Sequence, residues 1–124
     1  MFGPGAATKI YIALESIDMR KGFEGLHGLV RDHLNEDPLS GHVFLFSNRS
    51  HTRIKALVWD GSGLWVCAKR LERGSFHWPK PQQGTRSVTM RPEELATLVN
   101  GMDLKAARPR ANWYRRAASQ NSAA

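Results

Sequence analysis

The chain has 124 residues, 41% of them hydrophobic, and carries 18 Lys and Arg against 11 Asp and Glu, for a net charge of +7. This length and composition predict one globular domain with a core of its own and argue against wholesale disorder. The single cysteine, Cys67, excludes an internal disulfide and a cysteine-based zinc site. Its apolar neighbours predict a buried, inert thiol.

The basic charge is dominated by arginine, with twelve Arg to six Lys. The planar guanidinium fork suits phosphates and guanine edges, so this bias favours a nucleic-acid partner. The alternatives are a basic soluble protein from a GC-rich genome, or contact with acidic proteins or membrane surfaces. No apolar run reaches the roughly 18 residues that span a bilayer, so we expect no membrane partner and a cytoplasmic protein.

Three parts are predicted along the chain. Residues 1–8 are rich in small residues and predict a flexible N-terminal arm, and residues 9–104 predict a single α+β domain. Residues 105–124 predict a basic, partly disordered tail, which could order on nucleic acid or only aid solubility. The tail's Trp113 could also dock back on the sheet.

The domain begins with an apolar strand at Lys9–Leu14, followed by an amphipathic helix from Met19 to about Asn35 with Asp18 as its cap. Two features of this helix are unusual. Positive charge at Arg20 and Lys21 opposes the helix dipole. Glycine also recurs every third residue, at Gly22, Gly25 and Gly28. The helix could pack closely on a sheet, offer a phosphate-binding entry at Arg20 and Lys21, or start later than drawn.

An antiparallel meander of four strands is predicted next. Its clearest part is a hairpin, because Arg53–Trp59 alternates and is joined to Leu64–Lys69 by the turn sequence Asp60-Gly61-Ser62-Gly63. The other two strands are Val43–Phe46 and Phe76–Trp78. In the hairpin we expect Trp59 and Trp65 to be core residues more often than stacking platforms for bases.

Two further elements complete the fold. Arg86–Thr89 could add an edge strand, and Arg91-Pro92-Glu93-Glu94 opens a helix with proline first and acids in the first turn. The predicted class is therefore α+β, with an antiparallel β-meander of about four to six strands packed by two helices and a basic C-terminal tail.

No pattern of an active site is present. The five histidines lack metal-ligand spacing, and no nucleophile elbow, Walker loop or dinucleotide fingerprint occurs. Asp18, Asp60 and Asp103 could form a three-carboxylate metal set, but a cap, a turn and a loop explain them better. We therefore predict no catalytic residue, no cofactor and no metal.

Three segments carry a family resemblance: DMRKGFEGL (Asp18–Leu26), DPLSGHVFLF (Asp37–Phe46) and KALVWDGSGLWVCAKRLERGSFHWP (Lys55–Pro79). Their order and separations resemble the small accessory protein, often called TnpB, from the second reading frame of the insertion sequence 66 family. The resemblance covers about residues 9–104. It implies a role in DNA transposition beside two other element-encoded proteins, a larger transposase that does the strand chemistry and a second accessory protein. No catalytic residue is established for the accessory family.

The expected function is a non-catalytic accessory factor that binds DNA through a basic surface and helps assemble the transposase complex. The alternatives are an adaptor that recruits or activates the transposase without contacting DNA, and a cryptic metal-dependent nuclease. If the basic residues of the matching segments converge on one face, DNA binding is favoured; if they scatter, the adaptor is favoured. The candidate DNA contacts are Arg20, Lys21, Arg49, Arg53, Lys69, Arg70 and Arg73.

Overall fold

The computed structural model describes residues 8–100, 102–103 and 108–109. The arm predicted over residues 1–8 and the tail predicted over residues 105–124 therefore lie almost wholly outside the described residues. Within the described part, no helix is long and apolar enough to cross a membrane.

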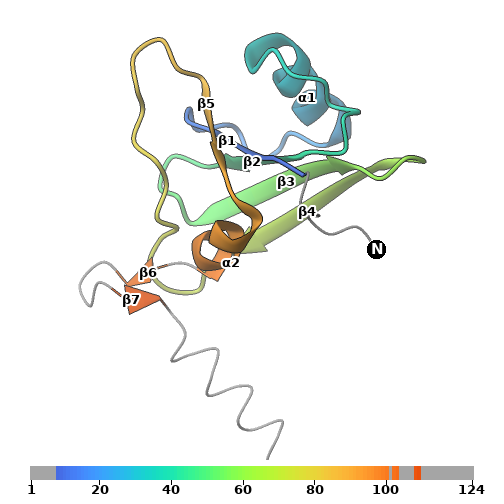
Figure 1. The fold of residues 1–124 in the computed structure, drawn as a ribbon. Helices are drawn as coiled ribbons and strands as arrows, with labels where there is room; N and C mark the ends of the chain where they lie inside the picture. The colour runs from blue at the N-terminus through green and yellow to red at the C-terminus, as the bar shows by residue number, and fades with distance from the viewer. Residues whose placement is uncertain (1–7, 101, 104–107, 110–124) are drawn as a thin grey trace, which may run out of the picture.

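A five-stranded sheet forms the centre of the fold, in the order β4-β3-β2-β1-β5 (Figure 1). The strands are β1 (Ile10–Ala13), β2 (Val43–Ser47), β3 (Arg53–Trp59), β4 (Leu64–Arg70) and β5 (Ser87–Met90). β1 runs parallel to β2, and every other neighbouring pair in this sheet is antiparallel. The predicted α+β class is thereby confirmed, as are the hairpin of β3 and β4 and the edge strand β5.

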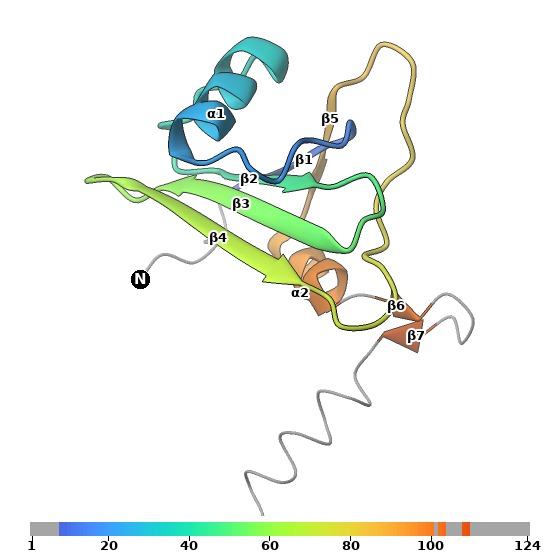
Figure 2. The same ribbon diagram turned by 180° about the vertical axis from the view of Figure 1, so that it is seen from behind.

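Two helices cover opposite faces of this sheet (Figure 2). On one face lies α1 (Phe23–Gly28), which continues directly into a π-helical turn, η1 (Leu29–His33). The other face is covered by α2 (Pro92–Asn100), whose first turn holds Glu93 and Glu94, as predicted. A short antiparallel pair, β6 (Met102–Asp103) and β7 (Arg108–Pro109), follows α2.

Alternation along the strands gives each face its own core. On the α1 face, Phe44, Phe46 and Leu57 pack with Leu26 and Val30. On the α2 face, the buried residues are Ile10, Ile12, Val43, Leu45, Ile54, Val58, Phe76, Trp78 and Leu98. Burying both faces explains why β2 is apolar at nearly every position rather than alternating.

The first helix begins later than the predicted Met19, and Asp18 does not cap it. Gly22 occupies the N-cap without any side-chain cap hydrogen bond. The Asp18 carboxylate instead accepts hydrogen bonds from the backbone and guanidinium of Arg20. These bonds hold the pKa of Asp18 at about 2. A local carboxylate–backbone turn of this kind competes with helix, which delays the helix start to Phe23.

The prediction that the glycine repeat packs closely on the sheet is wrong. A side chain at Gly22 or Gly28 would meet nothing within 4 Å, and one at Gly25 would meet only the Lys21 side chain, at 3.1 Å. Phe23, the first residue of α1, is 54% exposed. The burial of the helix depends instead on Leu26, Val30 and Leu34.

The predicted strand Phe76–Trp78 is also wrong, because this segment crosses the α2 face as a loop. Phe76 and Trp78 are nevertheless buried, at 2% and 7% exposure. The Phe76 amide donates to the His51 carbonyl at 2.7 Å. The Trp78 Nε1 donates to the Ala13 carbonyl at 2.9 Å, and its ring stacks on His51. These contacts hold the segment against the core and give hydrogen-bond partners to its buried polar groups without any strand pairing.

Because this segment does not pair with it, β4 lies at the edge of the sheet. Cys67 is therefore exposed rather than buried, and Trp65 is 45% exposed rather than a core residue. Trp59 is only half-buried. The prediction that these three residues lie inside followed from the apolar neighbours of Cys67 and from the expectation that tryptophans fill the core.

Asp60 organises the hairpin turn, as predicted. Its Oδ1 accepts hydrogen bonds from the amides of Ser62 and Gly63, both at 2.9 Å, and its Oδ2 accepts from the Trp65 Nε1 at 2.7 Å. These donors favour the charged carboxylate and hold the pKa of Asp60 well below its usual range.

Asp60→Ala is expected to lower the melting temperature at pH 7. A lowered pKa in the folded state stabilises the fold above the ordinary Asp value of about 3.9, and this contribution is lost as pH falls. The gap between variant and wild type should therefore shrink between about pH 4 and pH 2, as measured by thermal melts followed by circular dichroism. A gap that stays constant over that range would contradict this role of the carboxylate.

Candidate nucleic-acid interface

Sheet topology gathers several basic segments at one end of the strands. β2 and β4 end there and β3 begins there, since both neighbouring pairs are antiparallel. The two adjoining turns are tied together, because the Leu71 amide donates to the Thr52 carbonyl at 2.9 Å. The turn between β2 and β3, which holds Arg49, and the turn after β4, which holds Arg73, thus meet at the same end of the sheet.

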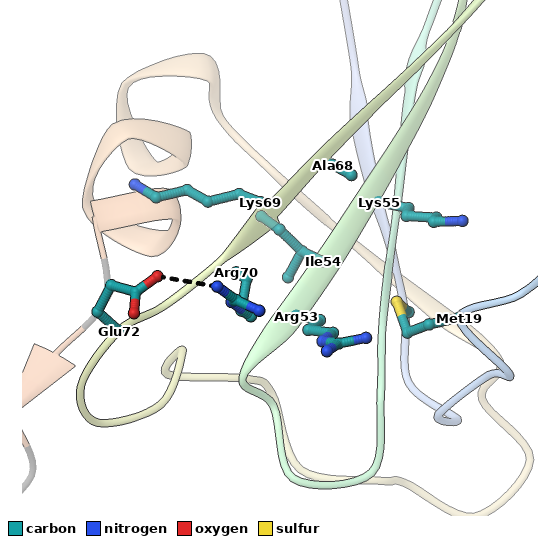
Figure 3. Close-up of a pocket in the computed structure, with 8 residues that line it drawn as sticks. All are labelled: Met19, Arg53, Ile54, Lys55, Ala68, Lys69, Arg70 and Glu72. Carbon is teal, nitrogen blue, oxygen red and sulfur yellow. Dashed lines mark hydrogen bonds and ion pairs between the residues drawn. The ribbon is translucent and has the colours of Figure 1, made fainter.

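A groove of about 470 Å³ lies at this end (Figure 3). Arg53 and Arg70 are cross-strand partners in the β3–β4 register and lie side by side. Lys55 is two residues along β3 on the same face as Arg53. The full lining consists of Met19, Arg53, Ile54, Lys55, Ala68, Lys69, Arg70 and Glu72.

The charges of this groove are poorly neutralised. Arg70 reaches Glu72 at 3.4 Å, a long contact between exposed side chains. Arg53 makes no ion pair with any residue in the described part of the chain. The Lys55 Nζ donates to the carbonyl of Lys21 at 2.8 Å, which fixes the amine without removing its charge. Like charges directly opposite each other on a sheet are destabilising, so the Arg53–Arg70 pair costs stability where it stands.

The seven predicted contact residues fall into three groups. Arg53, Lys69 and Arg70 line the groove. Arg49 and Arg73 are exposed in the two turns at the same end of the sheet. The segment with Arg20 and Lys21 crosses the α1 face to meet the groove, with Met19 in its lining.

Arg20 and Lys21 are less directly placed than the rest. The Arg20 guanidinium is 91% exposed and pairs with Asp18 at 2.7 Å. Lys21 contributes its carbonyl to Lys55, while its side chain lines a neighbouring hollow with Asp18 and His33. Five of the seven candidates therefore lie at the groove or its adjoining turns, and these two lie beside it.

Sequence reasoning missed Lys55 and Met19 as groove residues. A signal for Lys55 existed, since alternation placed it on the same face as Arg53. The aromatic residues of the meander are not part of the groove. Trp59 and Trp65 lie at the hairpin tip, at the far ends of β3 and β4, and Trp78 is buried on the α2 face.

The carboxylates do not assemble into a metal site in the part of the chain that is described. No group of three or more His, Cys, Asp or Glu could hold an ion there. Asp18 lies in the turn before α1 and Asp60 in the hairpin turn, each engaged in its own local hydrogen bonds. The side chain of Asp103 lies outside the described residues.

Glu72→Gln is expected to strengthen polyanion binding at the groove about two- to fivefold at low salt. The change removes the one acidic side chain of the groove and releases Arg70 from its ion pair, which exposed geometry makes weak. Fluorescence anisotropy with a labelled DNA duplex measures the effect. Glu93→Gln, at the start of α2, is the matched control and should leave the affinity unchanged. An equal gain in both variants would show that only net charge matters.

Fold and groove together define a small, basic α+β protein built on an open sheet. The sequence matches the family described as IS66 Orf2 like protein over residues 8–109. It is 38% identical over 103 residues to uncharacterized protein y4jC of Sinorhizobium fredii, covering 83% of this chain and 86% of the relative. It is 34% identical over 113 residues to uncharacterized protein y4hO of the same organism, covering 91% and 95%. No solved structure gives a significant match.

This chain therefore belongs to the IS66 Orf2-like family, which confirms the resemblance seen in the sequence. Membership implies an accessory role associated with transposition of insertion sequences.

Proposed function

We propose that this chain is a non-catalytic accessory factor that binds DNA through the basic groove and helps assemble the transposase complex. The observation that carries the proposal is the placement of Arg53 directly opposite Arg70, with Lys55 on the same face and Glu72 as the one acidic residue of the lining. Lys69 also contributes to the lining, but it alternates to the α2 face of β4. Two arginines opposite each other on neighbouring strands repel without an anion between them, and the long, exposed contact of Arg70 with Glu72 offsets this only weakly.

A phosphate backbone fits this arrangement chemically. Guanidinium groups bind phosphate oxygens through two parallel hydrogen bonds, and lysines add point charge. Arg49 and Arg73, exposed in the adjoining turns, would extend the contact along a strand. Such contacts go to the backbone and carry no sequence information by themselves, so the proposed binding is weakly selective.

The proposed partners besides DNA are the element's transposase and its second accessory protein. We assign strand chemistry to the transposase, in line with the separate local turns that hold Asp18 and Asp60 in this chain. A factor that acts on chromosomal DNA in bacteria works in the cytoplasm, which is the location we propose.

The proposal is tested by a salt titration of the wild-type protein against duplex and single-stranded DNA, using the element's terminal sequence and an unrelated sequence. Affinity should fall steeply with salt, by roughly 0.9 log units per log unit of salt for each phosphate contacted in duplex DNA. Similar affinities for the two sequences are expected. No measurable binding at about 50 mM salt would overturn DNA binding and favour the adaptor alternative.

The adaptor alternative makes a separate prediction. A complex with the transposase that forms without DNA should survive nuclease treatment and moderate salt. Co-purification followed by size-exclusion chromatography distinguishes the two functions, since a complex bridged by DNA would fall apart under nuclease.

A further inference from the structure

The outer edge of β4 offers backbone groups to a partner strand. Among the described residues, no strand pairs with that edge, although β4 is seven residues long. Two backbone hydrogen bonds fix which residues face inward: the Leu71 amide donates to the Thr52 carbonyl, and the Asp60 amide donates to the Gly63 carbonyl. Hydrogen-bonded pairs alternate along an antiparallel ladder, so Trp65, Cys67 and Lys69 direct their backbone groups toward β3.

The remaining β4 residues therefore direct their amides and carbonyls outward, away from the sheet. These residues are Leu64, Val66, Ala68 and Arg70. A row of outward donors and acceptors over a whole strand is a template for pairing with another chain.

The sequence of β4 is complementary to itself in one antiparallel register. When Cys67 faces Cys67 of a second copy, all seven residues overlap, and Val66 meets Ala68 while Leu64 meets Arg70. The outward-facing residues then form the hydrogen-bonded pairs, as the ladder requires. Lys69 faces Trp65 rather than another lysine. The basic residues that usually discourage edge pairing thus fall at opposite ends and do not oppose each other.

A second feature of the same edge is an open apolar pocket between β4 and α2, with a volume of about 180 Å³. Leu45, Ala56, Leu95 and Val99 form much of its wall, and Cys67, Ala68 and Lys69 form its side toward the free edge. A partner strand paired with β4 would lie beside the side of the pocket that faces the free edge. It would enclose apolar surface that one copy alone leaves accessible.

We propose that β4 pairs with β4 of a second copy of this chain about a two-fold axis centred on Cys67, joining the two sheets into one. Identical faces of the two sheets then lie on the same side, because each pair in the ladder shares a face. The two basic grooves would also lie on one side, separated along the strands by about 20 Å, which is six residues of strand. The pairing uses the backbone groups along the edge of β4, whereas the proposed DNA contacts are the basic side chains of the groove, although Ala68 and Arg70 belong to both surfaces. The test of the pairing uses no DNA.

The pairing is tested on the full chain by sedimentation velocity and by disulfide trapping. At high micromolar concentration the wild-type protein should sediment with a mass twice the 13.9 kDa of one chain. The dimer should dissociate on dilution. Mild oxidation should trap a covalent dimer, because Cα atoms of non-hydrogen-bonded partners lie about 4.5 Å apart, within disulfide range. Cys67→Ser should lose the trapped species and keep the dimer in sedimentation.

Two variants make the test specific. Ala68→Pro removes an outward amide at an exposed position and leaves the inward ladder intact, so the dimer should weaken at least tenfold while the thermal melt changes little. Thr89→Cys in a Cys67→Ser background places an exposed thiol on β5, at the other edge of the sheet, and should not be trapped. A wild-type monomer at all concentrations, equal trapping of both cysteines, or a dimer unaffected by Ala68→Pro would each overturn the pairing.

Discussion

Replacing Arg53 and Arg70 together by alanine should weaken duplex DNA binding roughly tenfold to a hundredfold near 0.1 M salt. The salt slope should also fall by about 1.8, since each lost phosphate contact accounts for roughly 0.9. The two side chains are exposed cross-strand partners, so their removal also relieves a like-charge repulsion. The variant should therefore fold at least as stably as wild type, with binding and stability changing in opposite directions.

The matched control removes the same charge from the opposite end of the sheet. Lys9 precedes β1 and Arg91 follows β5, and both are exposed where those two strands meet, far along the strands from the groove. Lys9→Ala/Arg91→Ala should lose no more than about threefold in affinity, through the general field of the protein alone. Equal losses in the two double variants would mean that net charge, and not the groove, controls binding.

Trp78→Ala should destabilise the fold by roughly 3–5 kcal/mol, which is the usual cost of removing a buried aromatic ring. Trp78 is 7% exposed, packs in the α2-face core and donates to the Ala13 carbonyl. Small domains of this kind have a free energy of unfolding of only about 5–15 kcal/mol, so the variant should unfold at a much lower urea concentration than wild type. Urea denaturation followed by circular dichroism measures the change.

Two further tryptophan variants separate packing from hydrogen bonding. Trp78→Phe keeps most of the ring and leaves the Ala13 carbonyl without its donor, at a cost of about 1–3 kcal/mol. Trp65→Ala, at a side chain that is 45% exposed, should cost less than either change. A Trp65→Ala variant more damaging than Trp78→Ala would contradict the assignment of the 76–78 segment as core.

The elements that sequence predicts best are those with their own local signals. The β3–β4 hairpin follows from strict alternation and the Asp60-Gly61-Ser62-Gly63 turn, and its β3 bounds match the expectation. The start of α2 follows from proline and two acids in the first turn. The hairpin and the helix start both depend on interactions between residues close together in the chain, so the sequence alone predicts them.

The predictions that failed concern segments whose conformation depends on contacts beyond their own local pattern. Phe76-His77-Trp78 alternates like a strand, but the partners that fix it are His51 and the Ala13 carbonyl, far away in sequence. The late start of α1 follows from the Asp18–Arg20 turn, a competition that residue type alone does not resolve. The first correction leaves β4 at the edge of the sheet, where Cys67 and Trp65 are exposed.

The candidate site was predictable in composition but not in geometry. Basic residues at strand ends are hard to bury, which singled out Arg49, Arg53, Arg70 and Arg73 from the sequence. The convergence of Arg53 and Arg70 with Lys55 required the register of β3 against β4 and the path of the segment before α1. The cross-strand opposition of two arginines, which carries the functional proposal, exists only in three dimensions.

The most direct measurement is site-specific photo-crosslinking to DNA. A photoreactive benzoylphenylalanine replaces Met19, which lies in the groove, or Thr97, which is exposed on α2 over the other face of the sheet. Irradiation with labelled duplex at low salt should crosslink the Met19 variant strongly and the Thr97 variant at background level, with the Met19 signal lost in Arg53→Ala/Arg70→Ala. Equal crosslinking at both positions, or a Met19 signal that survives loss of the two arginines, would contradict the groove as the DNA-binding surface.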